Sequence, residues 1–139
     1  MVCRALLTDP EILLLDEPTA GMDALSRRQM WNLLRKLNGK NLTILLTTHY
    51  MEEAQSLCGR VALMDHGKLE EINTPSGLID SLGRYTVDET LSDGTKSHYF
   101  HHRQEAIEFL SGLTGQAALR ETTLEDVFVE RAGRHLSPS

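Results

Sequence analysis

Two acidic side chains are the residues of this sequence best placed for chemistry. Asp16 and Glu17 directly follow an apolar run at residues 12–15, and Pro18 ends the segment. A carboxylate at the end of a buried strand can hold Mg²⁺ that bridges substrate phosphates, and a neighbouring carboxylate can deprotonate an attacking water. A strand that simply ends in a polar loop would explain one acid, but two adjacent acids followed by proline form a more specific pattern.

A histidine stands at the end of a second apolar run. His49 follows residues 42–47, and its imidazole could hydrogen-bond a phosphate oxygen or the attacking water. A lone histidine after a strand is more often a surface or helix-capping residue. However, the stretch from Glu17 to His49 has the length of one βαβ step, about 30 residues. Adjacent parallel strands would bring both side chains to one edge of a sheet.

Short apolar runs and helical patterns alternate from residue 1 to about residue 82, as in βαβ units. Asp23 is the expected N-cap of the helix at 24–37, and the run at 12–15 is typical of a strand buried on both faces. The expected strands are 12–15, 42–47, 60–64 and 68–72, and the expected helices are 1–7, 24–37, 51–58 and one that starts at Pro75. The sequence therefore predicts an α/β fold with a parallel sheet.

The remainder of the chain, from about residue 84, is more polar and has a different pattern of expected elements. Residues 85–91 and 95–100 flank Ser92-Asp93-Gly94, which predicts a hairpin, and a helix at 104–113 and a strand at 116–120 follow. Thr122 and Glu125 have the spacing of a capping box ahead of a last helix that ends near residue 132. We expect residues 135–139 to be frayed. These elements predict a small α+β domain.

Composition narrows the classes of function. The 139 residues contain 20 acidic and 14 basic side chains, a formal charge of −6, and 40% hydrophobic residues. Nucleic-acid binders usually carry a basic face, so no nucleic-acid partner is expected. No apolar run approaches the roughly 20 residues needed to cross a bilayer. A role at a membrane would therefore depend on a separate partner.

Three stretches together resemble the ATPase subunits of ABC transporters. LLLDEPTAGMD resembles their Walker B strand and D-loop, LLTTHYMEEA their H-loop with the following helix, and GRVALMDHGKLEE the strand pair that comes next. The motifs occur in family order and at family spacing. The resemblance implies that residues 1–82 form the parallel-sheet core of a P-loop NTPase without its N-terminal half, and that residues 83–139 form an accessory domain.

The resemblance also implies roles for single residues, with ATP and Mg²⁺ as cofactors. Asp16 would coordinate Mg²⁺ at the nucleotide, Glu17 would be the general base, and His49 would sense the γ-phosphate. Asp23 would lie at a dimer interface and reach toward the nucleotide of a second nucleotide-binding subunit. The other implied partner is a transmembrane permease subunit, which places the protein in the cytoplasm, peripheral on the inner face of the cell membrane.

The sequence departs from the family in lacking three motifs. It has no G-x-x-x-x-G-K-S/T phosphate-binding loop, no LSGGQ-type signature and no glutamine loop, which the resemblance would place upstream of Met1. We therefore expect the isolated chain neither to bind nor to hydrolyse ATP well. In the family, ATP is sandwiched between the phosphate-binding loop of one subunit and the signature of the other.

The segment ETTLEDVF, residues 121–128, resembles an element near the end of type-2 exporter ATPases, which export drugs, sodium or lipids. It favours a subunit that powers export. The accessory domain could serve dimer contact or regulation, or merely cover a hydrophobic edge, and the sequence leaves both open.

Two other classes of function stay open beside this one. The first is a naturally truncated, non-catalytic module that binds a partner ATPase. The second is a DNA-repair or translation ATPase of the same superfamily, which the acidic balance and the TLEDVF element disfavour. A metal site at His98, His101 and His102 is also disfavoured, because no cysteine or carboxylate pattern supports it. Trp31 is expected to serve packing, or a contact with a missing region, rather than ligand stacking.

Overall fold

A computed structural model describes the backbone of residues 2–136 and the side chains of residues 4–133. The chain divides into two compact units, residues 1–57 and residues 58–139. The predicted domain boundary near residue 82, drawn from the change in sequence pattern and from the resemblance, stays a prediction. Within the described residues, no helix combines the length and the apolar character needed to cross a membrane.

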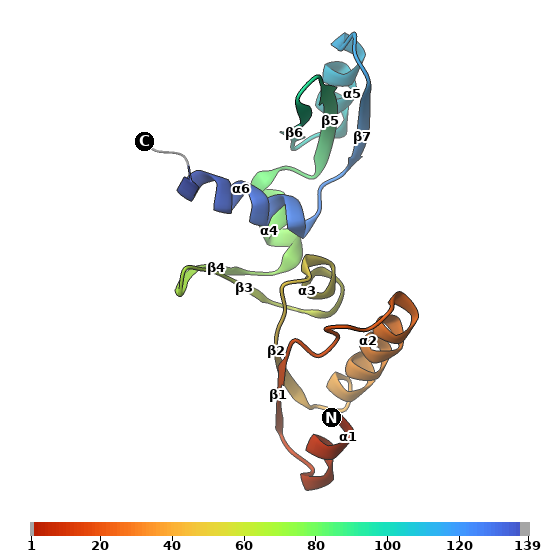
Figure 1. Ribbon diagram of the computed structural model, residues 1–139, viewed down its shortest axis with the longest axis vertical. Coiled ribbons are helices and arrows are strands. Elements are labelled where there is room, and N and C mark those ends of the chain that lie inside the picture. Colours follow the sequence, from red (N-terminus) through yellow and green to blue (C-terminus); the bar gives the residue numbers. More distant parts are fainter. Residues whose placement is uncertain (1, 137–139) are drawn as a thin grey trace. The chain divides into compact units, whose positions relative to one another are not determined.

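The first unit contains one βαβ step. Its elements are α1 (Val2–Ala5), a 3₁₀ turn (Leu6–Thr8), β1 (Ile12–Asp16), α2 (Ala24–Asn38), β2 (Thr43–Thr47) and α3 (Met51–Leu57). Strands β1 and β2 pair in parallel, with Asp16 opposite Thr47 (Figure 1). The predicted parallel pair and its connecting helix are therefore confirmed.

The core of the first unit lies between the strand pair and α2. Leu13 and Leu42 are buried there, and Met30, Leu33 and Leu37 of α2 pack against them. Successive strand side chains point to opposite faces, so Leu14 is 70% exposed while Leu13 is 3% exposed. The prediction of a strand buried on both faces is wrong for the described chain, because α2 covers one face of the pair and Ile12, Leu14 and Leu45 on the other face stay exposed.

Helix α2 begins at the predicted cap. Asp23 has extended backbone angles, and its Oδ1 accepts a hydrogen bond of 2.7 Å from the backbone N–H of Ser26. This backbone hydrogen bond lowers the pKa of the Asp23 carboxyl. The helix ends at Asn38, with Gly39 as its C-cap.

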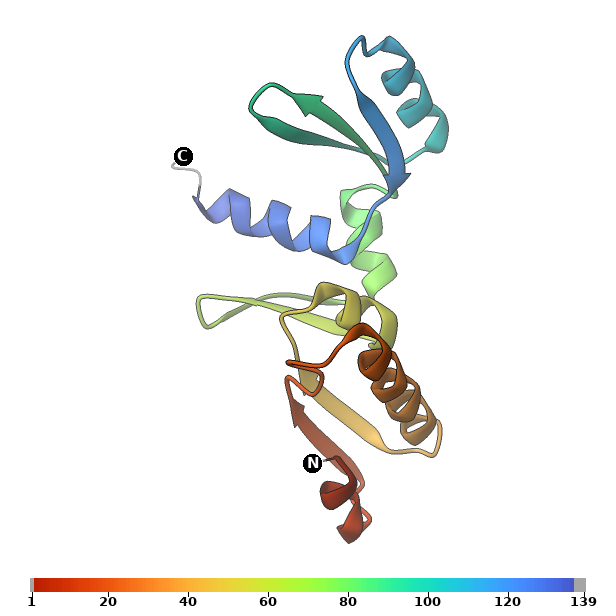
Figure 2. The ribbon, with the colours of Figure 1, turned by 45° about the vertical axis from the view of Figure 1, so that its right-hand side comes forward.

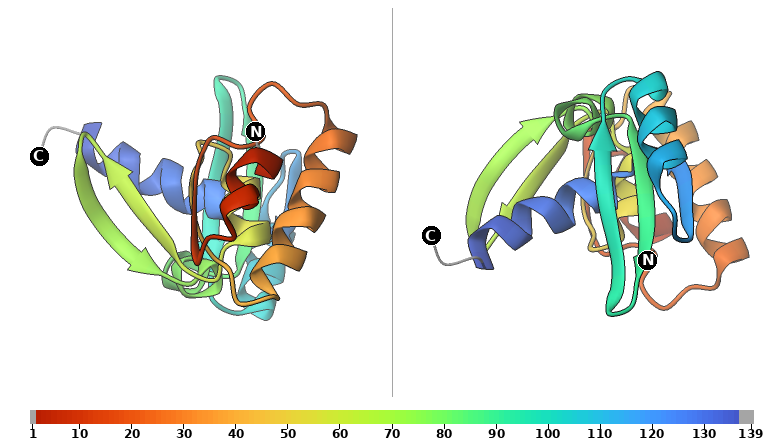
Figure 3. Two further views of the ribbon diagram at one scale, coloured as in Figure 1. Left: turned by 90° about the horizontal axis from the view of Figure 1, so that it is seen from below. Right: turned by 90° about the horizontal axis from the view of Figure 1, so that it is seen from above.

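The second unit begins with a hairpin. Its elements are β3 (Val61–Asp65), β4 (Lys68–Asn73), α4 (Pro75–Leu82), β5 (Tyr85–Leu91), β6 (Gly94–Phe100), α5 (Arg103–Gly112), β7 (Ala117–Glu121) and α6 (Leu124–Leu136). Strands β3 and β4 run in opposite directions and form their own sheet (Figure 3). The predicted third strand at 60–64 therefore pairs with β4 rather than with β2.

A three-stranded antiparallel sheet in the order β6-β5-β7 follows, among the residues described. The predicted hairpin joins β5 to β6, and α5 packs against the sheet (Figure 2). Helices α4 and α6 contact each other, and Leu78, Leu124 and Val127 are buried. The α+β prediction for this part of the chain is thus matched by its elements.

Helix α6 starts one residue later than predicted. Thr123 and Asp126 form the capping box: the Thr123 N–H donates to Asp126 Oδ2 at 2.8 Å, and the Asp126 N–H donates to Thr123 Oγ1 at 3.4 Å. The prediction that Thr122 and Glu125 form this box is wrong, because Thr122 is buried and its hydroxyl pairs with that of Thr86 at 2.7 Å. The helix also continues through Leu136, and residues 137–139 of the predicted frayed tail lie outside the described residues.

Candidate functional site

The carboxyl ends of β1 and β2 bring the predicted catalytic side chains together. Glu17 Oε1 lies 2.6 Å from His49 Nδ1, which is a hydrogen-bond distance. Next to this pair, the Thr47 hydroxyl donates to Asp16 Oδ1. The prediction that adjacent parallel strands place Glu17 and His49 at one edge is therefore confirmed, because their strands pair in register up to Asp16 and Thr47.

The backbone at Glu17 is held in an unusual conformation. Its φ angle is 45°, in the left-handed region that non-glycine residues rarely adopt. Its N–H donates to the Thr47 carbonyl at 2.9 Å, so the chain stays tied to β2 where it turns away from the sheet. Such a conformation costs about 1–3 kcal/mol and is found most often at functional sites.

The Glu17–His49 pair faces solvent. The two side chains are 45% and 64% exposed, and the His49 ring also lies 4.4 Å from the Tyr50 ring. An ion pair or hydrogen bond with this exposure contributes little to folding stability. The pair lies at the carboxyl ends of β1 and β2, where both side chains are accessible to a ligand. This position favours a role in binding or catalysis over a role in folding stability.

Asp16 offers the donor chemistry that Mg²⁺ requires. Its exposed carboxylate is a hard oxygen ligand at the end of β1. No group of three or more His, Cys, Asp or Glu side chains within the described residues could hold a metal by itself. Mg²⁺ is commonly held by one or two carboxylates together with substrate phosphates and water, so Asp16 fits that mode of binding.

Asp23 occupies a different position. Its carboxylate caps α2 rather than joining the Glu17–His49 pair in a hydrogen bond. The family role at the nucleotide of a second subunit therefore stays a prediction.

Sequence reasoning missed one buried acid near the site. Glu53 on α3 is fully buried and accepts hydrogen bonds from the Trp31 indole and the Thr19 hydroxyl. Trp31 is itself 6% exposed, in agreement with the predicted packing role. The sequence signal was the position of Glu53 four residues after His49, which places it on the first turn of a helix that starts at the site.

The three histidines considered for a metal site have separate surroundings. His98 Nε2 lies 3.0 Å from Glu89 Oε2, and its ring lies 4.5 Å from that of Phe109. His101 and His102 are exposed in the bend after β6. His98 therefore pairs with a neighbouring strand of its sheet, whereas the other two histidines lie in the bend between β6 and α5.

Comparison with known proteins shows which proteins this chain resembles. Nod factor export ATP-binding protein I of Burkholderia lata is 35% identical to this chain over 97% of it, and the protein of the same name from Sinorhizobium fredii is 36% identical over 95%. Over nearly its whole length, the chain resembles the ATP-binding proteins of ABC transporters. The predicted resemblance is therefore confirmed.

The chain spans about half the length of the curated relatives it matches, 51% and 45% of the two proteins named. No family model matches the chain. A solved structure, a dimeric ATP-binding cassette in a post-hydrolysis state bound to ADP and Pi, aligns with 52% of this chain and 32% of its own, at 30% identity and a TM-score of 0.49.

Proposed function

We propose that this chain supplies the hydrolytic residues of an ATP-binding subunit that powers an ABC exporter. The observation that carries the proposal is the 2.6 Å contact between Glu17 and His49 at the carboxyl ends of two parallel strands, with Asp16 beside it. Ligands of open α/β sheets bind at these strand ends. The export relatives support the direction of transport.

In this proposal Glu17 is the general base. One of its carboxylate oxygens takes a proton from the attacking water while the water oxygen bonds to the γ-phosphorus and the bond to the β–γ bridging oxygen breaks. His49 contacts the Glu17 carboxylate through Nδ1, and in the imidazolium form its Nε2–H would donate to a γ-phosphate oxygen. Bound Mg²⁺ would neutralise charge on the phosphates, and Asp16 is the residue that would hold it.

The remaining parts of the cycle belong to other segments and subunits. A phosphate-binding loop and a signature motif would grip ATP, and two ATP-binding subunits would close around it. Asp23 would then face the second subunit across the dimer. A transmembrane permease subunit would hold the dimer at the cytoplasmic face of the membrane and convert its opening and closing into export.

Turnover of ATP tests the proposal most simply in a complete subunit, meaning a polypeptide that joins these residues to a phosphate-binding loop and a signature. We expect Mg²⁺-dependent hydrolysis by the complete subunit and none by the 139-residue chain. Asp16→Asn should lower turnover about 100-fold at fixed Mg²⁺. Glu11→Gln, which neutralises an exposed acid just before the other end of β1, should not. Equal turnover in the Asp16→Asn variant and its parent would contradict the assignment of the metal ligand.

A further inference from the structure

A single buried carboxylate connects the three segments that surround the Glu17–His49 pair. Glu53 Oε2 accepts a hydrogen bond from the Trp31 indole N–H at 2.8 Å and another from the Thr19 hydroxyl. All three side chains are buried, and Glu53 and Thr19 have no exposed surface. One oxygen therefore joins α3, the segment after β1, and α2.

The position of these residues along the chain makes the connection significant. Thr19 is two residues after Glu17, and α3 begins at Met51, two residues after His49. Trp31 lies within α2, which packs against α3. The Glu53–Thr19 hydrogen bond thus links the segment that follows Glu17 to the segment that follows His49.

The other oxygen of Glu53 has an unusual environment. Oε1 is buried and has no hydrogen-bond partner among the described residues. Buried polar atoms are nearly always paired, and departures from this rule concentrate at functional sites. An apolar side chain of similar volume would pack the same space without an unpaired oxygen, so packing alone does not account for glutamate at this position.

We propose that Glu53 is a positioning residue, whose carboxylate holds the Glu17 and His49 segments in the register that lets their side chains meet. The inference deepens the proposed function, on which its catalytic meaning rests. Loss of the Glu53 acceptor would free Thr19 from α3 and allow the Glu17 segment to move relative to His49. The contact between Glu17 and His49 is then the property to measure.

The imidazole ¹⁵N spectrum of the 139-residue chain measures that contact directly. The His49 signal among the six histidines is assigned by its absence in His49→Ala, and Glu17→Ala gives its position when the contact is broken. We expect Glu53→Leu, which keeps bulk but removes the acceptor, to move the His49 Nδ1 signal most of the way to the Glu17→Ala position. Glu53→Gln keeps an acceptor oxygen and should leave the signal within about a tenth of that shift.

Two further variants separate positioning from general loss of structure. Thr19→Val keeps the side-chain shape and removes only the Thr19 hydrogen bond. It should move the His49 signal at least half of the way to the Glu17→Ala position, and this test holds even if Glu53→Leu fails to fold. Glu52→Leu changes an exposed acid on the same helix and should leave the His49 signal in place. Trp31 is the single tryptophan of the sequence, so its emission reports the other hydrogen bond of Glu53.

Each result has a distinct meaning. An unmoved His49 signal in both Glu53→Leu and Thr19→Val, with altered Trp31 emission in Glu53→Leu, would overturn the proposal and leave Glu53 as an anchor for α2. If Glu17→Ala itself fails to move the His49 signal, the Glu17–His49 contact is absent in solution. That outcome would overturn both the positioning role and the observation on which the proposed function depends.

Discussion

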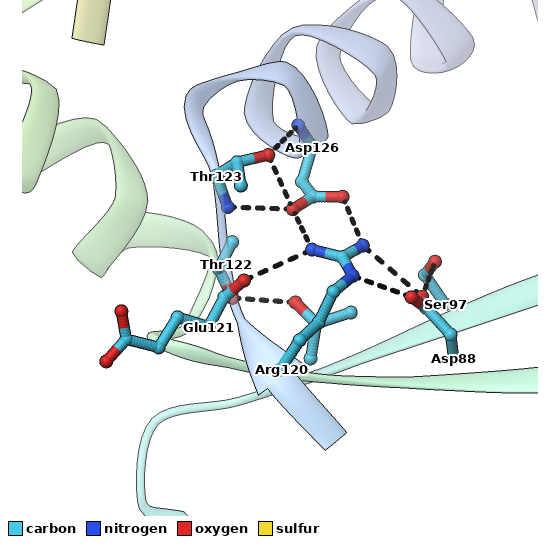
Figure 4. A network of polar contacts seen from close by, with 8 residues as sticks. Asp88, Ser97, Arg120, Glu121, Thr122, Thr123 and Asp126 are labelled. Carbon is cyan, nitrogen blue, oxygen red and sulfur yellow. Dashed lines mark hydrogen bonds and ion pairs between the residues drawn. The ribbon is translucent and has the colours of Figure 1, made fainter. Parts of the chain in front are cut away.

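Two clusters of charged side chains in this molecule differ in their exposure to solvent and in the number of contacts they make. In the first unit, Glu17 and His49 share one contact, and their side chains are 45% and 64% exposed. In the second unit, the Arg120 guanidinium lies between Asp88 and Asp126, whose side chains are 25% and 12% exposed (Figure 4). The first pair is open to a ligand, whereas the second cluster is closed on itself.

The Arg120 cluster uses the full hydrogen-bonding capacity of its guanidinium. Nε and Nη2 donate to the two Asp88 oxygens at 2.6 and 3.3 Å, and Nη1 and Nη2 donate to the two Asp126 oxygens at 2.7 and 2.8 Å. Nη1 also donates to the Glu121 carbonyl at 3.2 Å. Ser97 donates to Asp88 at 2.6 Å. A bidentate arrangement of this kind fixes geometry, so the cluster ties α6 to the sheet rather than serving a substrate.

The pKa values within the Arg120 cluster reflect its ion pairs. Hydrogen bonds from Arg120 lower the pKa of Asp88. Burial acts to raise the pKa of Asp126, but hydrogen bonds from Arg120 and Thr123 outweigh it and leave that pKa lowered. The Asp126 and Asp88 carboxylates in turn raise the pKa of Arg120. Ionised partners therefore stabilise one another in the closed cluster.

The largest expected effect is at the open pair. Glu17→Gln in the complete subunit removes the base while nearly preserving shape, so kcat should fall by about 100-fold or more, with ATP affinity within about 3-fold of the parent. Steady-state hydrolysis and equilibrium nucleotide binding measure the two quantities. Glu52→Gln on α3 is the matched control, and a kcat for Glu17→Gln equal to that of the parent would exclude Glu17 as the base.

The closed cluster should matter for stability instead. Arg120→Met leaves Asp88 and Asp126 without their cation, and we expect the second unit to lose about 2 kcal/mol of unfolding free energy, since solvent reaches part of the Arg120 side chain. Urea unfolding of the 139-residue chain by circular dichroism should show the loss. Trp31 emission reports the first unit and should keep its midpoint, and an equal shift of both signals would contradict the separation of roles.

Acid should weaken the same cluster. The folded pKa values of Asp88 and Asp126 are lowered, so the unfolded chain binds protons first as pH falls. Their contribution is complete above the unfolded pKa of about 3.9 and is lost as pH drops through the lower folded values. The stability difference between the parent and Arg120→Met should therefore shrink from pH 6 to pH 2.5, and a constant difference would contradict the assignment.

A smaller effect is expected where the chain enters the strand that carries Asp88. Gly83 ends α4 with a φ of 131°, and a Cβ there would lie 2.9 Å from backbone atoms of Phe100. Gly83→Ala should therefore cost more than about 1 kcal/mol by urea unfolding, whereas Gly112→Ala, whose added Cβ meets open space, should cost less. Similar losses for the two variants would show that Phe100 moves aside easily.

The smallest effect is expected at an exposed pair at the C-terminal end of α4. Arg84, in the bend after the helix, also binds an aspartate, but that residue is Asp80, only four positions earlier, and both side chains are exposed. Arg84→Met should lower the Tm of the 139-residue chain by less than about 2 °C, because exposed pairs of this kind are weak. If Arg84→Met lowered the Tm as much as Arg120→Met does, burial would not explain the difference between the two arginines.

The sequence predicted best where spacing alone sets geometry. The apolar runs before Asp16 and His49 and the helix between them predicted a parallel pair with both tips at one edge, and the structure has that pair. It predicted less well where a choice depends on neighbours distant in the chain. Thr122 and Thr123 both satisfy a local capping pattern, and only the buried partner Thr86 decides between them.

The buried polar contacts were beyond sequence reasoning for the same reason. Glu53 meets Trp31 and Thr19 from positions 22 and 34 residues away, and Arg120 meets Asp88 across 32 residues. Neither pattern has a fixed spacing that a local motif could reveal. The exposed face of β1 also differs from the prediction, because an apolar run specifies side chains suited to burial but not the element that covers them.

A double-mutant cycle on Glu17 and His49 tests the central claim that the open pair acts as one catalytic unit. Single-turnover hydrolysis is measured in the complete subunit for Glu17→Gln, His49→Ala and the combination. Our account predicts that the double variant is about as slow as the slower single variant, because each change already disables the pair. If the fold-loss of rate in the double variant equalled the product of the two single fold-losses, the residues would contribute independently. That result would contradict the account.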